Sequence, residues 1–401
     1  MTRRFETVAA VAIAVALGGC GAGPEATSTA ASAGAASADV APGTPGYAPR
    51  FEVDPLWPKP LPNNWLLGST IGLSVDSRDH VWILHRPGSL NARTEASAGE
   101  NTPTGACCSA APPVVELDAE GNVVSSWGGP GEGYDWPTSN HGLTVDHMDN
   151  IWIGGNDVAD SHILKFTRDG RLIMQLGTPD QNTGSHDPEN FGSPAEISID
   201  PAANEAYVAD GYGNRRVVVI DADTGERKRY WGAYGNSPDD TDLGLYDPDA
   251  PPAQQFRNPV HCAQPSNDGL VYVCDRANDR IQVFQTDGSF VDELMVAPET
   301  RGDGSVWDIA LSRDPGQAYI FLADGLNERI YVIHRESMEI LTSFGGGGRQ
   351  PGQFFGVHNI AVDSAGNLYT TETYEGKRLQ KFVYRGLAPI PEGEQGPPWP
   401  E

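Results

Sequence analysis

A hairpin pattern that recurs six times restricts the fold of this 401-residue chain more than any other feature. Each copy runs through a few alternating apolar residues, a polar turn and a second strand that carries an aromatic residue. Alternation with a period of two, with turns rich in Asp, Asn and Gly, predicts antiparallel hairpins rather than helices. The copies begin at Gly72, Gly142, Glu196, Cys262, Asp308 and Asn359, at intervals of 70, 54, 66, 46 and 51 residues.

Two further strands are expected after each hairpin, most clearly at 216–220, 280–284 and 329–333. Four strands in each of six repeats predict an all-β fold, a six-bladed β-propeller in which each blade buries its faces against its neighbours. The sixth repeat fades after Phe382, and residues 51–54 are expected to supply its outer strand and close the ring. A sandwich of six strand pairs is the rival fold, which the equivalence of the repeats disfavours.

Three copies of Asn-x-Arg stand before the third strand of their repeats, at 214–216, 278–280 and 327–329. This motif resembles the signature of NHL repeats, so the blades are expected to be NHL-like. The role expected of these arginines is structural, in packing and hydrogen bonding between blades.

The two ends of the chain are expected to lie outside the propeller, which we place at residues 49–387. Residues 1–19 have a basic start and an apolar run too short to span a bilayer, which is typical of a signal peptide. The Leu-Gly-Gly-Cys sequence that follows resembles a bacterial lipobox, which implies lipidation at Cys20, export, and attachment to a membrane through that lipid alone. Residues 20–48 are a small-residue linker, and the Pro-rich residues 388–401 are expected to be a disordered tail.

Charge and cysteine content narrow the partners and the compartment. A formal net charge of −27 repels phosphate backbones, so no nucleic-acid partner is expected. Cys262 and Cys274 flank a turn and are predicted to pair across a hairpin in an oxidising compartment. The partners of Cys107 and Cys108 cannot be read from their spacing.

The residue just before each repeat start gives the strongest indication of a functional site. In blade order this position holds Ile71, His141, Ala195, His261, Trp307 and His358. Histidine therefore occupies alternate blades, which are related by roughly 120° around the propeller axis. Any one of these histidines, taken singly, reads as a hydrogen-bonded core residue, but together they predict three imidazoles that meet in the central channel.

Three neutral imidazoles with an open fourth position are the ligand set of a catalytic zinc site. Imidazole also suits copper, nickel and iron, so the site is better defined than the element. The remaining six histidines do not follow the pattern and are expected to be structural.

With these residues in place, the chain resembles the peptidyl-α-hydroxyglycine α-amidating lyase family over most of residues 66–383. The family's first zinc histidine lies in His-Gly-Leu, as at 141–143, and its second follows a Val-Pro segment, as at 258–261. The family's tyrosine motif Asp-Gly-Tyr-x-Asn-x-Arg is matched at 210–216, and its arginine motif Asp-Arg-x-Asn-x-Arg-Ile-Gln at 275–282.

The resemblance implies a zinc-dependent lyase that cleaves a carbinolamide to an amide and glyoxylate. Its substrate would be a small molecule or peptide of the α-hydroxyglycine type with a carboxylate. Arg86 and Arg276 would bind that carboxylate, because guanidinium groups form strong charge-assisted hydrogen bonds. Tyr212 would act as general base. Structural roles remain open for these residues, with Tyr212 as an aromatic of the blade turn and Arg86 as a loop residue.

The chain also departs from the family pattern. The family has an aspartate after its third histidine that helps bind calcium, and Asn359 stands there in this chain. An amide oxygen brings no charge, so calcium, with the carbonyls of Leu73 and Leu143 as further ligands, is a weaker expectation. The segments 87–113 and 230–255 have no counterpart, and both are expected over or beside the channel mouth.

Two other functions remain open. A non-catalytic NHL propeller could bind a ligand or partner at the cell surface, since fold alone does not define activity. A calcium-dependent lactonase-like hydrolase is the third hypothesis, and the three axial histidines count against it.

Overall fold

The computed structural model describes residues 40–91, 95, 107–393 and 395–400. The chain divides into two compact units, residues 1–35 and 36–401, and every described residue belongs to the second. The signal peptide, Cys20 and most of the expected linker therefore lie outside the described residues. Among the described residues, no helix combines the length and apolarity that a bilayer span requires.

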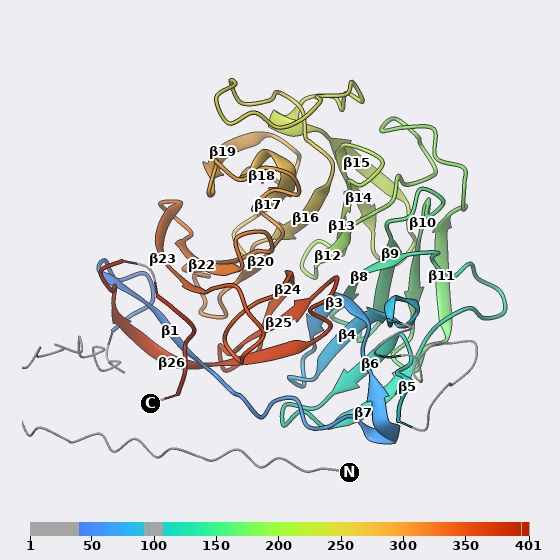
Figure 1. Cartoon of the computed structure of the whole chain (residues 1–401). Coiled ribbons are helices and arrows are strands. Elements are labelled where there is room, and N and C mark those ends of the chain that lie inside the picture. The colour runs from blue at the N-terminus through green and yellow to red at the C-terminus, as the bar shows by residue number, and fades with distance from the viewer. Residues whose placement is uncertain (1–39, 92–94, 96–106, 394, 401) are drawn as a thin grey trace, which may run out of the picture. The chain divides into compact units, whose positions relative to one another are not determined.

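The described chain forms six antiparallel sheets of four strands, arranged around a common centre (Figure 1). This is the six-bladed β-propeller predicted from the repeats, and each predicted hairpin forms the two inner strands of one blade. The strands of blades one to three are β3 (Ser69–Val75), β4 (Val81–Arg86), β6 (Val114–Leu117) and β7 (Val123–Trp127); β8 (Asn140–Val145), β9 (Ile151–Gly155), β10 (His162–Phe166) and β11 (Leu172–Gly177); and β12 (Glu196–Asp200), β13 (Glu205–Asp210), β14 (Arg216–Asp221) and β15 (Arg227–Trp231).

The second half of the ring repeats the same order. Its strands are β16 (Val260–Pro265), β17 (Leu270–Asp275), β18 (Arg280–Gln285) and β19 (Phe290–Met295); β20 (Asp308–Leu311), β21 (Tyr319–Asp324), β22 (Arg329–His334) and β23 (Glu339–Gly345); and β24 (Val357–Val362), β25 (Leu368–Glu372), β26 (Leu379–Pro389) and β1 (Tyr47–Val53). Outside the blades lie the short pair β2 (Trp65–Leu66) and β5 (Ser109–Ala110) and the 3₁₀ turns η1 (Pro62–Asn64), η2 (Pro87–Ser89), η4 (Ala233–Gly235) and η5 (Arg276–Asn278).

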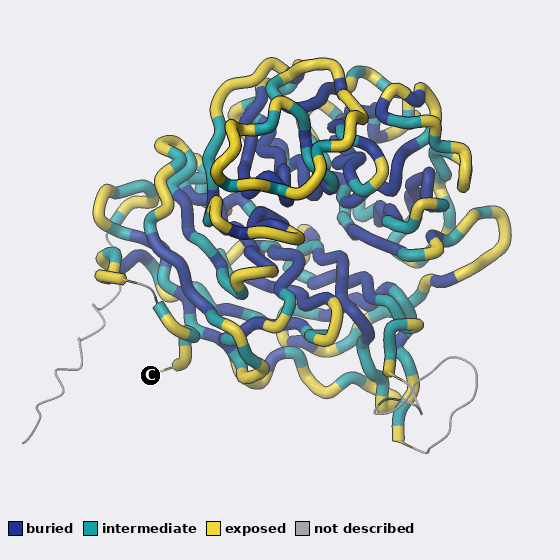
Figure 2. The backbone as a smooth tube through the Cα atoms, turned by 45° about the horizontal axis from the view of Figure 1, so that its top comes forward, coloured by how far each residue is buried: buried dark blue, intermediate teal, exposed yellow. Residues whose placement is uncertain are grey.

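The hydrophobic core lies between the blades. Six clusters of buried apolar residues each join one pair of adjacent blades, so every blade is covered on both faces. In the tube view the buried strands lie inside and the exposed loops outside (Figure 2). This distribution explains why the strands read as alternating and strongly apolar segments.

In blades one, two and six, the aromatic side chain of the hairpin donates a hydrogen bond to an aspartate at the hairpin turn. In blades one and two, the indole nitrogens of Trp82 and Trp152 donate to Asp76 and Asp146 over 3.0 Å. The same aspartates accept backbone N–H groups of their own hairpin turns. A single carboxylate thus holds both the turn and the buried aromatic ring.

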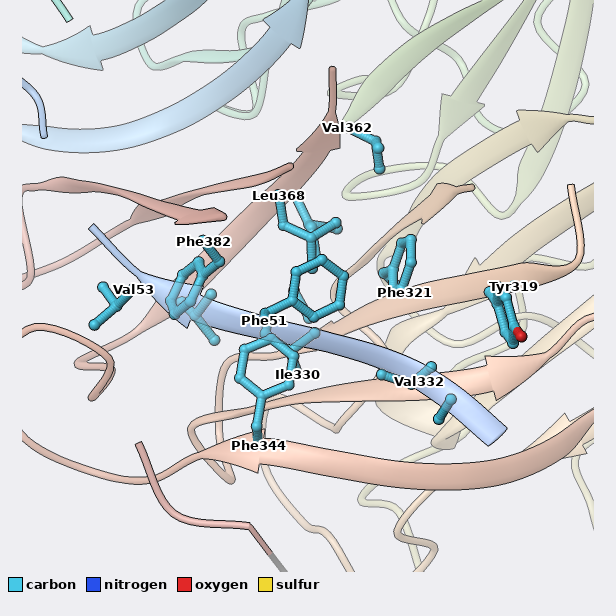
Figure 3. Packing of buried hydrophobic residues seen from close by; sticks show 14 of the residues in the cluster. Phe51, Val53, Tyr319, Phe321, Ile330, Val332, Phe344, Val362, Leu368 and Phe382 are labelled. Carbon is cyan, nitrogen blue, oxygen red and sulfur yellow. The ribbon is translucent and has the colours of Figure 1, made fainter. Parts of the chain in front are cut away.

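The ring closes as predicted, because β1 pairs with β26 as the outer strand of the sixth blade. Phe51 of β1 packs against blade five, where its ring lies 5.4 Å from that of Phe321 and 5.6 Å from that of Phe344 (Figure 3). The C-terminal residues differ from the disorder expected of them. β26 runs to Pro389, and the carbonyl of Pro398 accepts a hydrogen bond from Val53.

Two disulfides are present. Cys262 and Cys274 are direct partners in the β16–β17 ladder and are bonded, as predicted. Cys107 and Cys108, whose partners the sequence left open, are bonded to each other.

Candidate metal and active site

The three histidines predicted to meet do so at the centre of the propeller. His141, His261 and His358 lie near the starts of the innermost strands β8, β16 and β24, and each is no more than 2% exposed. Their ring centroids are 4.9 to 5.2 Å apart, and one ring nitrogen from each lies within 4.8 Å of the other two.

A β-bulge places each imidazole. The ladder register shifts between His141 and Leu143, between Val260 and Cys262, and between Val357 and Ile360. A bulge re-aims one side chain relative to the strand, which here occurs at each histidine position. In blade two, Gly142 has a φ of +68°, and a Cβ there would lie 2.4 Å from the carbonyl oxygen of Ala195. Only glycine fits this bulge.

Hydrogen bonds select one tautomer for all three rings. The Nδ1 atoms of His141 and His261 donate to the backbone carbonyls of Ala195, over 2.8 Å, and Trp307. The Nδ1 of His358 donates to the side-chain oxygen of Asn359 over 2.7 Å. Each Nε2 is therefore left with its lone pair available, which is the form that ligates a metal.

Burial also keeps these rings neutral. It lowers the pKa of His141 and His261 well below the usual value, and it lowers the pKa of His358 to about 3. The charges of neighbouring groups act in the same direction on His141 and His261. Neutral imidazoles are the state that a divalent cation requires.

Tyr212 lies directly at this cluster. Its hydroxyl is 3.1 Å from the Nε2 atoms of both His141 and His261, and it accepts a hydrogen bond from Arg276 over 3.2 Å. The hydroxyl has one proton, so it can donate to only one of the two ring nitrogens. One Nε2 lone pair therefore remains without a proton donor from this tyrosine.

Both predicted arginines are near the cluster, in different environments. Arg86 ends β4 and donates to the carbonyl of Asn140 over 3.1 Å and to the side-chain oxygen of Asn156 over 2.8 Å. Burial lowers the pKa of Arg86. Arg276 is 6% exposed and lies 4.5 Å from the ring of Trp307. Among the described residues, the buried Nε of Arg276 has no hydrogen-bond partner.

Two acidic residues that sequence reasoning missed lie beside this site. Glu196 and Asp308 begin the innermost strands of blades three and five and are hydrogen-bonded to each other. Burial, followed by the charge of Asp308, raises the pKa of Glu196 well above its usual range. Asn359 donates to Asp308 over 3.2 Å. Alignment of the repeat starts could have revealed both acids.

At the calcium site expected from the sequence, the side-chain oxygen of Asn359 is already used in hydrogen bonds. Leu73, Leu143 and Asn359 all lie in innermost strands. However, the side-chain oxygen of Asn359 already accepts hydrogen bonds from His358 and Thr371. It therefore has less capacity for calcium than the sequence suggested, and its direct effect is to orient His358.

The two segments without a counterpart in the family, 87–113 and 230–255, are described to different extents. Most of 87–113 lies outside the described residues, but Ser89 accepts from Ser69 and donates to the carbonyl of Arg86. The segment 230–255 packs beside the loop that carries Tyr212. There, Asp240 accepts hydrogen bonds from Ser185, and Arg215 donates to the carbonyl of Thr241.

In a second cluster of possible metal ligands, an arginine already balances the charge of the carboxylates. Asp76, His80 and Glu116 lie within metal-ligand distance of one another. Arg168 donates to both carboxylates, so a cationic side chain already balances their charge. We therefore assign this group to the packing between blades one and two.

The donor set of the histidine cluster fits zinc. It offers three neutral nitrogens of one tautomer, each oriented by an oxygen acceptor, as in catalytic zinc sites. The Tyr212 hydroxyl, 3.1 Å from two of the Nε2 atoms, and Arg276, which donates to that hydroxyl, are further polar groups at the cluster.

Comparison with known proteins agrees with the resemblance in part. No family model matches the chain. Over 350 residues it is 26% identical to peptidyl-alpha-hydroxyglycine alpha-amidating lyase 1 of Drosophila melanogaster, covering 83% of this chain and 59% of the fly protein. It is 25% identical over 287 residues to NHL repeat-containing protein 3 of Mus musculus, covering 69% of this chain and 65% of the mouse protein.

The chain thus has distant homology to an amidating lyase and to an NHL-repeat protein, and it spans less than two thirds of either. A solved structure described as streptogramin B lyase aligns with a TM-score of 0.48 at 13% identity, covering 84% of this chain and 98% of that one.

Proposed function

We propose that this protein is a zinc-dependent lyase that cleaves an α-hydroxyglycine-type carbinolamide to an amide and glyoxylate. The observation that carries the proposal is the position of the Tyr212 hydroxyl. It lies 3.1 Å from two of the three clustered imidazole nitrogens and accepts a hydrogen bond from Arg276. A proton-transfer group, a metal ligand set and a carboxylate-binding cation therefore converge on one point.

The two arginines orient the substrate. Besides its hydrogen bond to Tyr212, Arg276 has a long 3.7 Å contact to the exposed Asp303 and a buried Nε without a described partner, so it has capacity left for a substrate carboxylate. Arg86, held by Asn156, supplies the second guanidinium. Charge-assisted hydrogen bonds from both would fix the carboxylate and place the neighbouring carbon near Tyr212.

Tyr212 moves the proton. Cleavage requires that the substrate hydroxyl lose its proton as its electrons form the C=O bond of glyoxylate, that the C–N bond break, and that the amide nitrogen gain a proton. The Tyr212 hydroxyl can give its own proton to the departing nitrogen and take that of the substrate hydroxyl. The step then consumes no proton overall, which suits a single positioned acid–base group.

His141, His261 and His358 would hold the zinc ion, which when bound would supply Lewis acidity toward the substrate oxygen. Calcium is a secondary proposal. The buried Asp308 supports it, because its carboxylate oxygen accepts a hydrogen bond from Asn359 over 3.2 Å and is an oxygen ligand of the kind that calcium takes.

Elemental analysis of residues 40–401, followed by a glyoxylate-release assay, tests the proposal. The wild-type protein should carry about one zinc per chain and release glyoxylate from α-hydroxyhippurate. The His261→Ala variant should lose both properties. A folded, metal-free wild-type protein with full activity would contradict the assignment of a metal to this site.

The alternative is a non-catalytic propeller that binds a ligand or partner. It would be favoured if a metal-replete, folded wild-type protein released no glyoxylate from any α-hydroxyglycine compound. The propeller fold is compatible with both functions.

We also propose that the protein is exported and lipidated at Cys20, which lies outside the described residues. The two disulfides support an oxidising compartment. Mass spectrometry of the mature N-terminus should find a diacylglyceryl cysteine, and Cys20→Ser should abolish it.

A further inference from the structure

A polar cavity lies beside the proposed active site, between the loops that follow β9, β11 and β13 in blades two and three. It has a volume of about 470 Å³, which is within the ~300–1,000 Å³ range of small-molecule sites. Tyr212 belongs to its wall, and the hydroxyl of the same residue lies 3.1 Å from the Nε2 of His141 in the histidine cluster. Its polar lining consists of Asn156, Ser161, Asp180, Asn182, Ser193 and Tyr212.

Asn156 connects this cavity to the carboxylate-binding arginine. Its Oδ1 accepts hydrogen bonds from Arg86 and from the hydroxyl of Ser139, each over 2.8 Å. Because a guanidinium can only donate, these contacts define which end of the amide faces Arg86. Among the described residues, the Nδ2 of Asn156 has no acceptor, so it can donate to a carbonyl oxygen in the cavity.

Two further groups in the lining lack partners within the described chain. The hydroxyl of Ser161 is fully buried and makes no hydrogen bond. The carboxylate of the exposed Asp180 makes no hydrogen bond or ion pair, although its backbone N–H donates to the carbonyl of Ala159. Among the described residues that line the cavity there is no lysine or arginine, and Val158 is the one aliphatic side chain. The cavity thus presents a negative charge and an amide donor.

We propose that this cavity binds the acyl group of the substrate and selects acyl groups that carry an ammonium group. The inference rests on the proposed lyase function, which places the substrate carboxylate at Arg86 and Arg276. The acyl carbonyl then accepts from Asn156, and the ammonium group lies opposite Asp180. The preferred substrate class is an aminoacyl-α-hydroxyglycine.

Long alkyl acyl groups are disfavoured by the same lining. Their burial would remove water from Asp180 and Asn156 without replacing its hydrogen bonds, which is costly for a charged group. The substrate is therefore closer to a short peptide than to a fatty acid derivative.

The test compares glycyl-α-hydroxyglycine with propionyl-α-hydroxyglycine, which differ only in an ammonium group against a methyl group. The wild-type protein should have a kcat/KM about three- to fivefold higher for the glycyl compound, which is the size of effect expected of an exposed charge pair. Asp180→Asn should bring the ratio close to one. Asparagine suits the backbone there, since Asp180 has a φ of +59°. The preference should also shrink in 1 M NaCl.

Asp169→Asn is the matched control, because it removes one exposed carboxylate at the β10–β11 turn. It should keep the wild-type ratio. Equal kcat/KM values for the two substrates in the wild-type protein, or an unchanged ratio in Asp180→Asn, would overturn the acyl-site proposal.

A binding measurement separates this proposal from the lyase function. Glycylglycine and propionylglycine lack the hydroxyl that cleavage requires, and their affinities can be measured by calorimetry. If the protein cleaves neither α-hydroxyglycine compound, the lyase proposal fails. Tighter binding of glycylglycine that is lost in Asp180→Asn would still support the acyl site, and equal affinities would reject it.

Discussion

The loops that carry Tyr212 and Arg276 contain two kinds of polar residue with opposite surroundings. In the 275–280 loop, Arg280 donates to Asp275, to the hydroxyl of Tyr234 and to two backbone carbonyls. Arg276, four residues away and also buried, contacts a tyrosine hydroxyl, an aromatic face and a distant carboxylate. All three guanidinium nitrogens of Arg280 donate hydrogen bonds to the protein, whereas the Nε of Arg276 has no described partner.

The 210–216 loop shows the same division. Arg216 donates to Asp210 and to the backbone carbonyls of three residues around the neighbouring turn, and it is fully buried. Tyr212 instead places its hydroxyl among groups that belong to other blades. The NHL-like residues Asp210, Asn214 and Arg216 therefore hold the loop together through hydrogen bonds to one another. Tyr212, which lies between them in the sequence, contacts the groups of the central channel. Arg276 and Arg280 are both buried, so unsatisfied hydrogen-bonding capacity separates these two arginines better than burial does.

The largest effect is expected from Tyr212→Phe. Loss of the hydroxyl should lower kcat by about two to four orders of magnitude. The melting temperature should stay within ~2 °C of wild type, because the hydroxyl does not hold its own loop together. Calorimetry and glyoxylate assays measure the two quantities.

Tyr234→Phe is the control for Tyr212→Phe, because it removes a tyrosine hydroxyl that bonds to structural residues. Its hydroxyl accepts from Arg280 and donates to Glu293. Its loss should cost about 1–3 kcal/mol of stability and leave turnover unchanged. An equal loss of turnover in both variants would contradict the division between the two groups.

Arg280→Met and Arg276→Met should separate stability from turnover. Arg280→Met leaves Asp275 buried without its ion pair, so the free energy of unfolding should fall by about 3–5 kcal/mol. Arg276→Met should change stability by less than ~1 kcal/mol. It should lower kcat/KM by about 10- to 150-fold through loss of charged hydrogen bonds.

Denaturant unfolding and steady-state kinetics on both arginine variants check this prediction. Similar destabilisation by the two substitutions would show that Arg276 is as structural as Arg280.

Asn359→Ala should weaken metal binding by about 10- to 100-fold, because the Nδ1 of His358 loses the acceptor that orients it. Asn359→Asp retains an acceptor and should bind at least as tightly as wild type. Competition with a metal chelator gives both affinities. An unchanged affinity in the alanine variant would mean that His358 needs no orienting partner.

The smallest effect concerns Asp279, a buried loop residue whose Oδ2 has no described partner. Burial raises its pKa to about 7 in the folded protein. The protonated form is therefore favoured by folding, and its contribution to stability falls as the pH rises from about 4 to about 7.

Asp279→Asn removes this titration and keeps an acceptor for the Ser305 N–H. Its melting temperature relative to wild type should rise between pH 5 and pH 8, by about 2 °C for each kcal/mol. A difference that does not change with pH would contradict the assignment.

The local pattern of the sequence determined the propeller and the three histidines of the site, whereas Tyr212, Arg86 and Arg276 were expected from the family resemblance. Hairpin alternation and repeat spacing define six blades, since strand period and turn chemistry are local properties. Because the blades are equivalent, repeat alignment also placed His141, His261 and His358 in one ring. The ring closure by β1 followed from counting strands.

Tertiary structure alone decided how these residues are used. The acceptors that orient His141 and His261 belong to neighbouring blades, 54 and 46 residues away. The contact between Tyr212 and Arg276 joins blades three and four, and the free amide of Asn156 depends on Arg86 of blade one. The bulges, the tautomers and the unsatisfied groups all arise from contacts between blades, which no single repeat encodes.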